Sequence, residues 1–170
     1  METRVLNEEQ LEQVEELLKG FNEYQVFEII AGLKTCGANV AIYANTEYMG
    51  KQMRQIRLGL EKELDVSFYA DPKFNWKQMW QIREGLRCGL NVSLYADPKY
   101  DDLQMEELRL GARFHYDFTS AYADPRFDHN QMHEILIGQR KGLDVSSYAN
   151  PELDVAEMQK IRGTLERNRR

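Results

Sequence analysis

Two histidines four residues apart are the side chains whose type and spacing come closest to a chemical site. His129 and His133 follow Asp128 in a segment expected to be helical, so both imidazoles would lie on one helix face. Such a pair can hold a divalent metal and would make the chain a metal-dependent enzyme. The chain has one further histidine, His115, and segments of similar sequence carry unrelated residues at these two positions. We therefore expect no metal site, and a solvated, variable helix face instead.

The other reactive side chains do not form a catalytic pattern either. Cys36 and Cys88 lie far apart in the sequence and outside any CxxC pair, so we expect reduced, buried thiols. Asp101 and Asp102 suit a helix N-terminus, where a cap and a first-turn acid are favoured. The sequence contains no glycine-rich phosphate loop, no GxSxG motif and no HExxH motif. We predict that the chain is not an enzyme and has no cofactor and no small-molecule substrate.

Four arginines recur at one position of related segments: Arg57, Arg83, Arg109 and Arg162. In one interpretation they form a basic ladder that contacts the phosphates of a nucleic acid. In the other, each arginine bonds a carboxylate or a carbonyl in the adjacent segment, for instance near Asp71, Asp97 or Asp124. We favour the structural interpretation, because a residue that holds one geometry should recur, whereas a residue that recognises a partner need not.

An internal repeat of about 26 residues must position these side chains. The phrase Gln-Met-x-x-Ile-Arg begins at Gln52 and at Gln78, and it returns in altered form elsewhere in the chain. All four prolines occupy one repeat position, so none of them marks a linker. We predict a single repeat domain over residues 1–170, with repeats that start near residues 6, 21, 48, 74, 100, 127 and 153. The first and the last of these fit terminal caps.

Each repeat is predicted to form an α-helix followed by a short helical turn. Asn75 stands where an N-cap is needed, and an aspartate takes its place in the three later repeats. Met79, Ile82 and Leu86 then follow at offsets of three and four, the period of an amphipathic helix. Because one repeat cannot bury this stripe alone, stacked copies must do so. The predicted fold class is all-α, an α-solenoid of about seven helix–short-helix repeats.

Recurrent glycines and tyrosines indicate how the repeats pack. A glycine in the helix interior costs about 1 kcal/mol relative to alanine, and five repeats carry one: Gly32, Gly59, Gly85, Gly111 and Gly138. We expect these glycines to allow close approach of the neighbouring repeat. Five tyrosines are expected to form a buried ladder whose hydroxyls reach polar surroundings: Tyr43, Tyr69, Tyr95, Tyr122 and Tyr148.

The phrases Tyr-Ala-Asp-Pro at Tyr69 and Tyr-Ala-Asn-Pro at Tyr148 make the unit resemble the leucine-rich repeat variant, which alternates α- and 3-10 helices. This resemblance covers only part of each repeat and implies a similar architecture. The fuller phrase from Gln78 to Pro98 also resembles repeats in proteins of conjugative elements and phages from gut Firmicutes. Those proteins often accompany antirestriction and other anti-defence genes. The second resemblance covers nearly the whole chain and implies an association with mobile elements.

The charge balance limits the kinds of partner. The chain has 22 Lys and Arg against 28 Asp and Glu, a net charge of −6. An acidic balance argues against a general binder of phosphate backbones, which needs a basic face. No apolar run is long enough to span a membrane. The beginning of the chain turns acidic at once and has no apolar signal segment, so we expect a cytoplasmic protein without membrane contact.

Positions that break the repeat indicate where a partner binds. Two residues after the glutamine of each repeat, the side chains are unrelated: Phe27, Arg54, Trp80, Glu106 and His133. Trp76, one helical turn before Trp80, joins them, because exposed aromatic residues are typical anchors of protein interfaces. We predict a non-catalytic binder of a protein, most specifically a mobile-element or phage inhibitor of a host-defence nuclease, of the anti-CRISPR or antirestriction type. The alternative is a nucleic-acid-binding repeat protein that uses the recurrent arginines and the exposed aromatic residues.

Overall fold

The computed structural model describes residues 16–114 and 121–169, and every regular element within them is helical. The α-helices are α2 (Glu23–Thr35), α3 (Gly50–Leu60), α4 (Trp76–Arg87), α5 (Asp102–Arg113), α6 (His129–Arg140) and α7 (Val155–Asn168). Three 3-10 helices follow α2, α3 and α4, namely η1 (Gly37–Ile42), η2 (Val66–Phe68) and η3 (Val92–Leu94). The predicted all-α class is therefore confirmed. The repeat expected to start near residue 6 begins outside the described residues.

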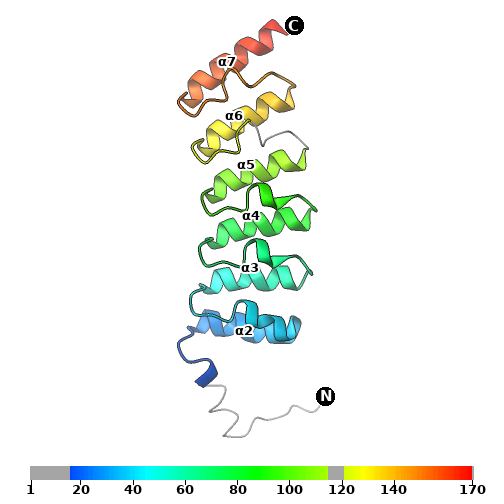
Figure 1. The fold of residues 1–170 in the computed structure, drawn as a ribbon, viewed down its shortest axis with the longest axis vertical. Helices are drawn as coiled ribbons and strands as arrows, with labels where there is room; N and C mark the ends of the chain where they lie inside the picture. The colour runs from blue at the N-terminus through cyan, green and yellow to red at the C-terminus, as the bar shows by residue number, and fades with distance from the viewer. Residues whose placement is uncertain (1–15, 115–120, 170) are drawn as a thin grey trace.

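The α-helices lie in one row. From α2 to α7, each helix packs against the next helix of the chain. Figure 1 shows this row along the long axis of the molecule, with the C-terminus at the end beyond α7. The connecting segments after α2, α3, α4 and α6, the first three of which include η1, η2 and η3, return the chain to the starting side of the row. Equivalent positions of successive helices therefore lie next to one another.

Most of the helices begin where the sequence predicts a cap. The side chain of Asn75 accepts hydrogen bonds from the backbone N–H groups of Lys77 and Gln78 at the start of α4. The predicted aspartates cap α5, α6 and α7 in the same way. Helix α3 is the exception, because it begins after Met49, whose side chain forms no capping hydrogen bond.

A buried glutamine in each of five repeats joins that repeat to the next. In α3, Oε1 of Gln52 accepts a hydrogen bond from the backbone N–H of Met49 (2.6 Å). Its Nε2 donates to the carbonyls of Pro72 (3.0 Å) and Phe74 (2.6 Å) in the following loop. The same arrangement occurs at Gln25, Gln78, Gln104 and Gln131. Because buried carbonyls need a donor, each glutamine fixes the position of the following repeat.

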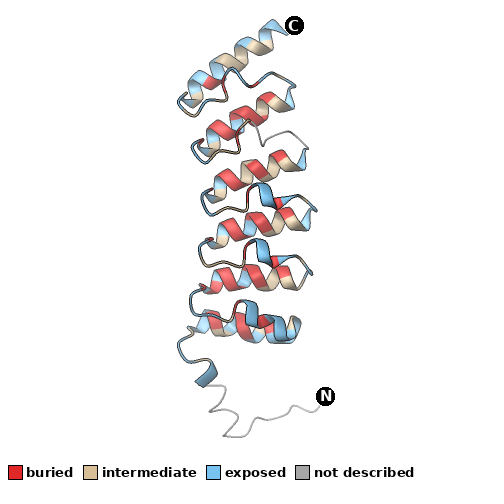
Figure 2. Cartoon of the chain, viewed as in Figure 1, coloured by how far each residue is buried: buried red, intermediate tan, exposed pale blue. Residues whose placement is uncertain are grey.

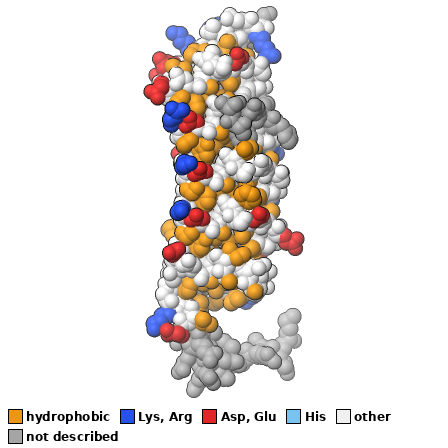
Figure 3. Space-filling view, in the orientation of Figure 1, with side chains coloured by type: hydrophobic (Ala, Val, Ile, Leu, Met, Phe, Trp, Pro, Cys, Tyr) orange, Lys and Arg blue, Asp and Glu red, His pale blue; other side chains and the backbone are white. Residues whose placement is uncertain are grey.

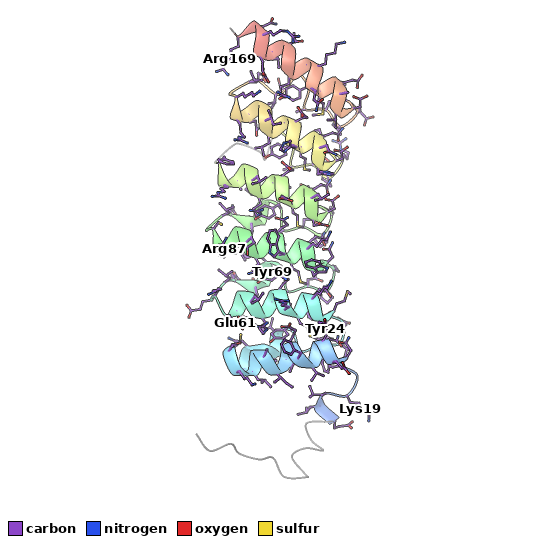
Figure 4. All side chains as sticks on the ribbon, turned by 180° about the vertical axis from the view of Figure 1, so that it is seen from behind. Lys19, Tyr24, Glu61, Tyr69, Arg87 and Arg169 are labelled. Atoms are coloured by element: carbon purple, nitrogen blue, oxygen red, sulfur yellow. The ribbon has the colours of Figure 1, made fainter. Side chains whose placement is uncertain are left out.

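The recurrent glycines make room for the tyrosine of their own repeat. A Cβ atom at Gly59 would lie 1.9 Å from Oη of Tyr69, which follows α3 in the same repeat (Figure 4). Oη of Tyr69 donates to the backbone carbonyl of Gln55 at 3.2 Å. The same glycine–tyrosine contact occurs in three more repeats, at Gly32 and Tyr43, Gly85 and Tyr95, and Gly138 and Tyr148. The prediction that the recurrent glycines accommodate the neighbouring repeat is therefore wrong for these four, and it stays a prediction for Gly111.

The core runs along the whole row. Met53 and Ile56 of α3 are fully buried together with Tyr69, and the equivalent residues of the next repeats extend this column. Figure 2 shows buried residues interleaved with half-buried and exposed ones along the helices from α3 to α6, as expected for an amphipathic helix. Burial raises the pKa of Tyr43 and Tyr148 to about 12. The predicted burial of the five tyrosines is thus confirmed. The expectation that every hydroxyl reaches a polar group is wrong for Tyr95, whose buried hydroxyl has no hydrogen-bond partner among the described residues.

Candidate interaction surface

The recurrent arginines bond the helix of the preceding repeat. Nε of Arg57 in α3 lies 2.7 Å from Oε2 of Glu28 in α2, and the two side chains are only 13% and 5% exposed. The same contact joins three more pairs, Arg83 with Gln55 (3.1 Å), Arg109 with Gln81 (2.8 Å) and Arg162 with Glu134 (2.8 Å). These contacts support the structural interpretation, since a guanidinium held between two helices is poorly placed to contact a phosphate.

The aspartates that precede the prolines are not the partners of these arginines. Oδ1 of Asp97 accepts a hydrogen bond from the backbone N–H of Lys99 (3.0 Å), and the ammonium of Lys99 lies 3.0 Å from Oδ2. These two hydrogen bonds lower the pKa of Asp97. Asp71 and Asp124 accept backbone hydrogen bonds in the same way. The prediction that they pair with the recurrent arginines is therefore wrong, and they hold the loops between repeats instead.

One junction between helices lacks the arginine. Leu136 occupies its position in α6, and Nδ1 of His133 lies 3.0 Å from Oε2 of Glu107 in α5. His133 thus has a structural partner across the repeat boundary. Within residues 16–114 and 121–169, no three His, Cys, Asp or Glu side chains are grouped so that they could hold a metal. The pair His129 and His133 therefore has no group of further ligands beside it among the described residues, and His115 lies outside them.

The two cysteines lie in different environments. Cys36 is half-buried after α2, and its thiol lies 3.8 Å from the carbonyl oxygen of Arg57. Cys88 is exposed directly after α4. Both thiols are free. The prediction that both are buried holds only in part for the half-buried Cys36, and it is wrong for Cys88, because the helix ends there and the residue faces solvent.

The positions that break the repeat lie on the outward side of the helices. Phe27 is 63% exposed and Trp80 is 38% exposed. Arg54 and His133 are also exposed, whereas Glu106 is half-buried. Since each lies two residues after the glutamine of its helix, all five share one rotational position. The structure thus places the five residues on consecutive helices, from Phe27 on α2 to His133 on α6, with Trp80 at the middle of this line and Arg54 on the helix before it.

Trp76 and Trp80 form the centre of this surface on α4. A cation from a neighbouring helix lies over each indole ring. Nζ of Lys51 in α3 lies 5.0 Å from the ring centroid of Trp76, and the guanidinium of Arg109 in α5 lies 5.7 Å from the ring centroid of Trp80. A hollow of about 300 Å³ opens beside both rings. Lys77 and Asp102 form an ion pair in its lining (3.4 Å). We define the tryptophan patch as Lys51, Arg54, Trp76, Lys77 and Trp80.

A larger hollow adjoins this patch at the N-terminal ends of α2 and α3. It has a volume of about 910 Å³, and its lining includes Tyr24, Met49, Gly50 and Trp76. Tyr24, labelled in Figure 4, and Met49 are strongly exposed. A Cβ atom at Gly50 would lie 2.9 Å from Cβ of Tyr24, so the glycine lets α3 approach that tyrosine. Trp76 therefore borders both hollows.

Sequence reasoning selected the two tryptophans and Arg54 but not Lys51, Tyr24 or Met49. A signal for these residues exists in the repeat. Gly50 stands where α4 has Trp76, so a side chain is missing next to a tryptophan and a hollow becomes possible. The depth of that hollow depends on how far the helices approach each other, which the repeat period does not specify.

A second exposed apolar surface follows the 3-10 helices. Ile42, Phe68 and Leu94 occupy one position of three successive repeats, and all three are partly exposed. Figure 3 shows hydrophobic side chains along much of the molecule on the face seen there. In the later repeats this position carries Ala121 and Ser147, so the apolar stripe does not continue.

The acidic charge is concentrated near the beginning of the sequence. Residues 1–15 carry Glu2, Glu8, Glu9, Glu12 and Glu15 against Arg4, which accounts for most of the net charge of −6. The row of helices therefore carries nearly balanced charge. In the described part of the chain, no helix is both long and apolar enough to cross a membrane.

Comparison with known proteins assigns no relative to this chain. No protein-family model, no curated protein and no solved structure matches it. A functional assignment must therefore come from the chemistry of the surface.

Proposed function

We propose that this chain is an α-solenoid of helix–short-helix repeats that binds a protein partner, without catalysis, through the outward side chains of its long helices. One observation carries the proposal. The inward and lateral positions of the helices are engaged in contacts between repeats, while Trp76 and Trp80 remain accessible beside two hollows. Partly exposed tryptophans next to apolar hollows are typical of the anchor residues of protein interfaces.

Contacts between repeats support this division of roles. The glutamine of each helix bonds the next loop, as Gln52 does, and the arginine bonds the preceding helix, as Arg57 does. Such residues recur because they join successive repeats, although α6 has Leu136 in place of the arginine. The residue two positions after the glutamine has no recurrent partner and changes from Phe27 to Arg54 to Trp80. A variable side chain at a fixed outward position is how repeat scaffolds present a binding surface.

The nucleic-acid alternative has less support. Its arginines contact the preceding helix, with Arg83 and Arg109 donating to glutamine side chains. Binding to a phosphate backbone requires several available cations along one groove. A gel shift with single-stranded and duplex RNA and DNA at two salt concentrations tests the alternative. We expect no complex at physiological salt, and a salt-sensitive complex would favour nucleic-acid binding.

Within the class of protein binders, the resemblance to repeats of mobile elements points to an inhibitor of a host-defence nuclease. The acidic run from Glu8 to Glu16 could compete for the basic channel of such a nuclease. Purified chain added to the nuclease of a restriction or CRISPR system is then expected to reduce cleavage. The reduction should weaken steeply with salt, because exposed charges are screened.

The test of the proposed function compares two double variants of the full chain. Protein captured from the native host is identified by mass spectrometry, and its purified form is titrated against each variant. Trp76→Ala/Trp80→Ala should abolish binding and leave the melting temperature nearly unchanged, since Trp80 is 38% exposed. Phe68→Ala/Leu94→Ala, with similar exposure on the 3-10 helices, is the matched control and should bind normally. Loss of binding in the control alone would contradict the proposal.

A further inference from the structure

We infer that the tryptophan patch recognises an acidic segment of its protein partner, with an apolar side chain of that segment entering the hollow beside Trp76 and Trp80. The inference rests on the proposed function and names the chemistry of the partner. It depends on the charge of the patch, on the way the indoles hold cations, and on the apolar hollow between them.

The first observation is a pair of exposed cations without carboxylate partners. Lys51 and Arg54 lie one helical turn apart on α3, and neither has an ion pair with any residue that the structure describes. By contrast, the exposed cations of α4 are paired, since Lys77 forms an ion pair with Asp102 and Arg87 forms one with Glu84. The α3 side of the patch therefore places two cations without ion pairs beside the indoles, and Glu23 and Glu47 lie further along, in the lining of the larger hollow.

The second observation is that the indoles hold cations in place. The ammonium of Lys51 lies over the ring of Trp76, and the guanidinium of Arg109 lies over the ring of Trp80. A cation held on an aromatic ring loses less side-chain freedom when a carboxylate binds it. Arg109 is engaged with Gln81 at 2.8 Å and serves to hold the Trp80 ring, so Lys51 is the cation held in place for a carboxylate. The patch is thus organised for carboxylates before a partner arrives.

The hollow defines the rest of the partner. The hollow has a volume of about 300 Å³, and it is lined by the two indoles together with Lys77, Gln81 and Asp102. The indole surfaces favour an apolar side chain, because burial of apolar area is favourable. Lys77 lies at the same place and would be shared between Asp102 and a carboxylate of the partner. An acidic segment that includes a leucine or a similar residue satisfies both requirements.

Two other occupants fit less well. A basic segment would meet Lys51, Arg54 and Lys77 at close range, and like charges are unfavourable. A single-stranded nucleic acid would need indole faces on which its bases can stack, but Lys51 and Arg109 cover one face of each ring. An acidic protein segment is therefore the occupant that the patch favours.

Intrinsic fluorescence gives a direct test, because Trp76 and Trp80 are the only tryptophans of the chain. The full chain is titrated with a peptide of about a dozen residues built from Glu-Leu-Glu-Glu units, roughly the span of a small docking segment. A matched peptide has lysine in place of every glutamate, and an oligothymidylate of similar length represents nucleic acid. We expect the acidic peptide alone to shift the tryptophan emission, with an affinity that weakens with salt.

Charge reversal then localises the binding. Lys51→Glu/Arg54→Glu should weaken binding of the acidic peptide about tenfold or more, as expected when close charge pairs become repulsive. Lys34→Glu/Lys160→Glu changes the net charge equally at exposed lysines of α2 and α7, and should leave the affinity within about twofold. Stronger binding of the lysine peptide or of the oligothymidylate would overturn the inference. Equal effects of the two double variants would overturn it as well.

The same variants separate this inference from the proposed function. If Trp76→Ala/Trp80→Ala abolishes binding of the captured protein while Lys51→Glu/Arg54→Glu does not, the surface binds a partner that is not acidic. The inference then fails and the proposed function stands. If the tryptophan variant binds the captured protein normally, both fail at this surface.

Discussion

The hydroxyl of Tyr69 fills the space that a side chain at Gly59 would need, since a Cβ atom there would lie 1.9 Å from Oη. The carbonyl of Gln55, one turn earlier in α3, accepts the hydrogen bond of that hydroxyl. Glycine in a helix interior is unfavourable, yet the repeat retains it because the tyrosine returns onto its own helix. The short segment after each helix is thereby fixed to that helix.

Gly59→Ala is therefore expected to destabilise the chain. Alanine favours the helix by about 1 kcal/mol, but its Cβ would displace Tyr69 and approach Cγ1 of Val66 at 2.9 Å. Overpacking of this kind costs about 1–3 kcal/mol, so a net loss is expected in the free energy of unfolding in urea. Gly163→Ala in α7 is the control, because its nearest atom lies 3.7 Å away, and it should stabilise. Equal stabilisation by both substitutions would refute the packing described for Gly59.

Much of the helical architecture follows from the sequence. The period of about 26 residues, the cap at Asn75 and the stripe of Met79 and Ile82 predict helices that the structure shows at these places. The contact partner of each recurrent residue cannot be predicted from the sequence in the same way. A glycine and a tyrosine ten positions apart, such as Gly59 and Tyr69, could meet within one repeat or across two, and the spacing alone does not decide this.

The arginine partners and the interaction surface show the same limit. Successive arginines donate to Glu28, Gln55 and Gln81. Because the acceptor is a carboxylate in one repeat and an amide in the next two, the sequence does not reveal this position as the partner of the arginine. The tryptophans could be selected because they break the repeat. The missing side chain at Gly50 is visible in the sequence, but the depth of the hollow next to Trp76 could not be predicted, because it depends on how closely Gly50 approaches Tyr24.

Removal of one of the recurrent arginines should lower the free energy of unfolding. Arg57→Met leaves the carboxylate of Glu28, which is 5% exposed, without its partner in the next repeat. An unpaired buried charge costs about 3–5 kcal/mol, and the loss is measured by chemical unfolding. Arg54→Met, one turn earlier on the outward side, should change stability by less than about 0.5 kcal/mol. Similar small effects at both positions would indicate that Arg57 is available for a partner.

The hydrogen bonds that the glutamines form between repeats can be tested by replacing only the donor nitrogen of the side chain. Gln78→Glu keeps the oxygen that accepts the N–H of Asn75 but replaces the donor to the carbonyls of Pro98 and Tyr100. We expect a loss of about 1–3 kcal/mol in unfolding experiments at neutral pH, because two carbonyls lose their donor. Glu157→Gln at the equivalent, exposed position of α7 is the control and should be nearly neutral. A neutral Gln78→Glu would mean that these bonds do not hold the repeats together.

The tyrosine ladder predicts unfolding at high pH. Burial raises the pKa of Tyr43 and Tyr148 from 10.0 to about 12 and raises the pKa of Tyr69, Tyr95 and Tyr122 as well. The folded state thus favours the neutral phenol, and its contribution to stability is complete below pH 10 and is lost as the pH rises towards about 12. Tyrosinate absorbance and far-UV circular dichroism should change together in this range. Ionisation of all tyrosines near pH 10 with the helices intact would contradict the ladder.

The central claim is that the outward surface of α3 and α4 contacts a protein partner, and the two tryptophans report on it directly. The decisive measurement is the emission of the chain, and its quenching by a small water-soluble quencher, as the purified partner is added. Trp76 and Trp80 are the only tryptophans of the chain. If the partner has no tryptophan, or if its own emission is subtracted, the remaining tryptophan signal comes from these two residues. The account predicts a blue shift and protection from the quencher at saturation. Unchanged emission and unchanged quenching in a saturated complex would contradict it.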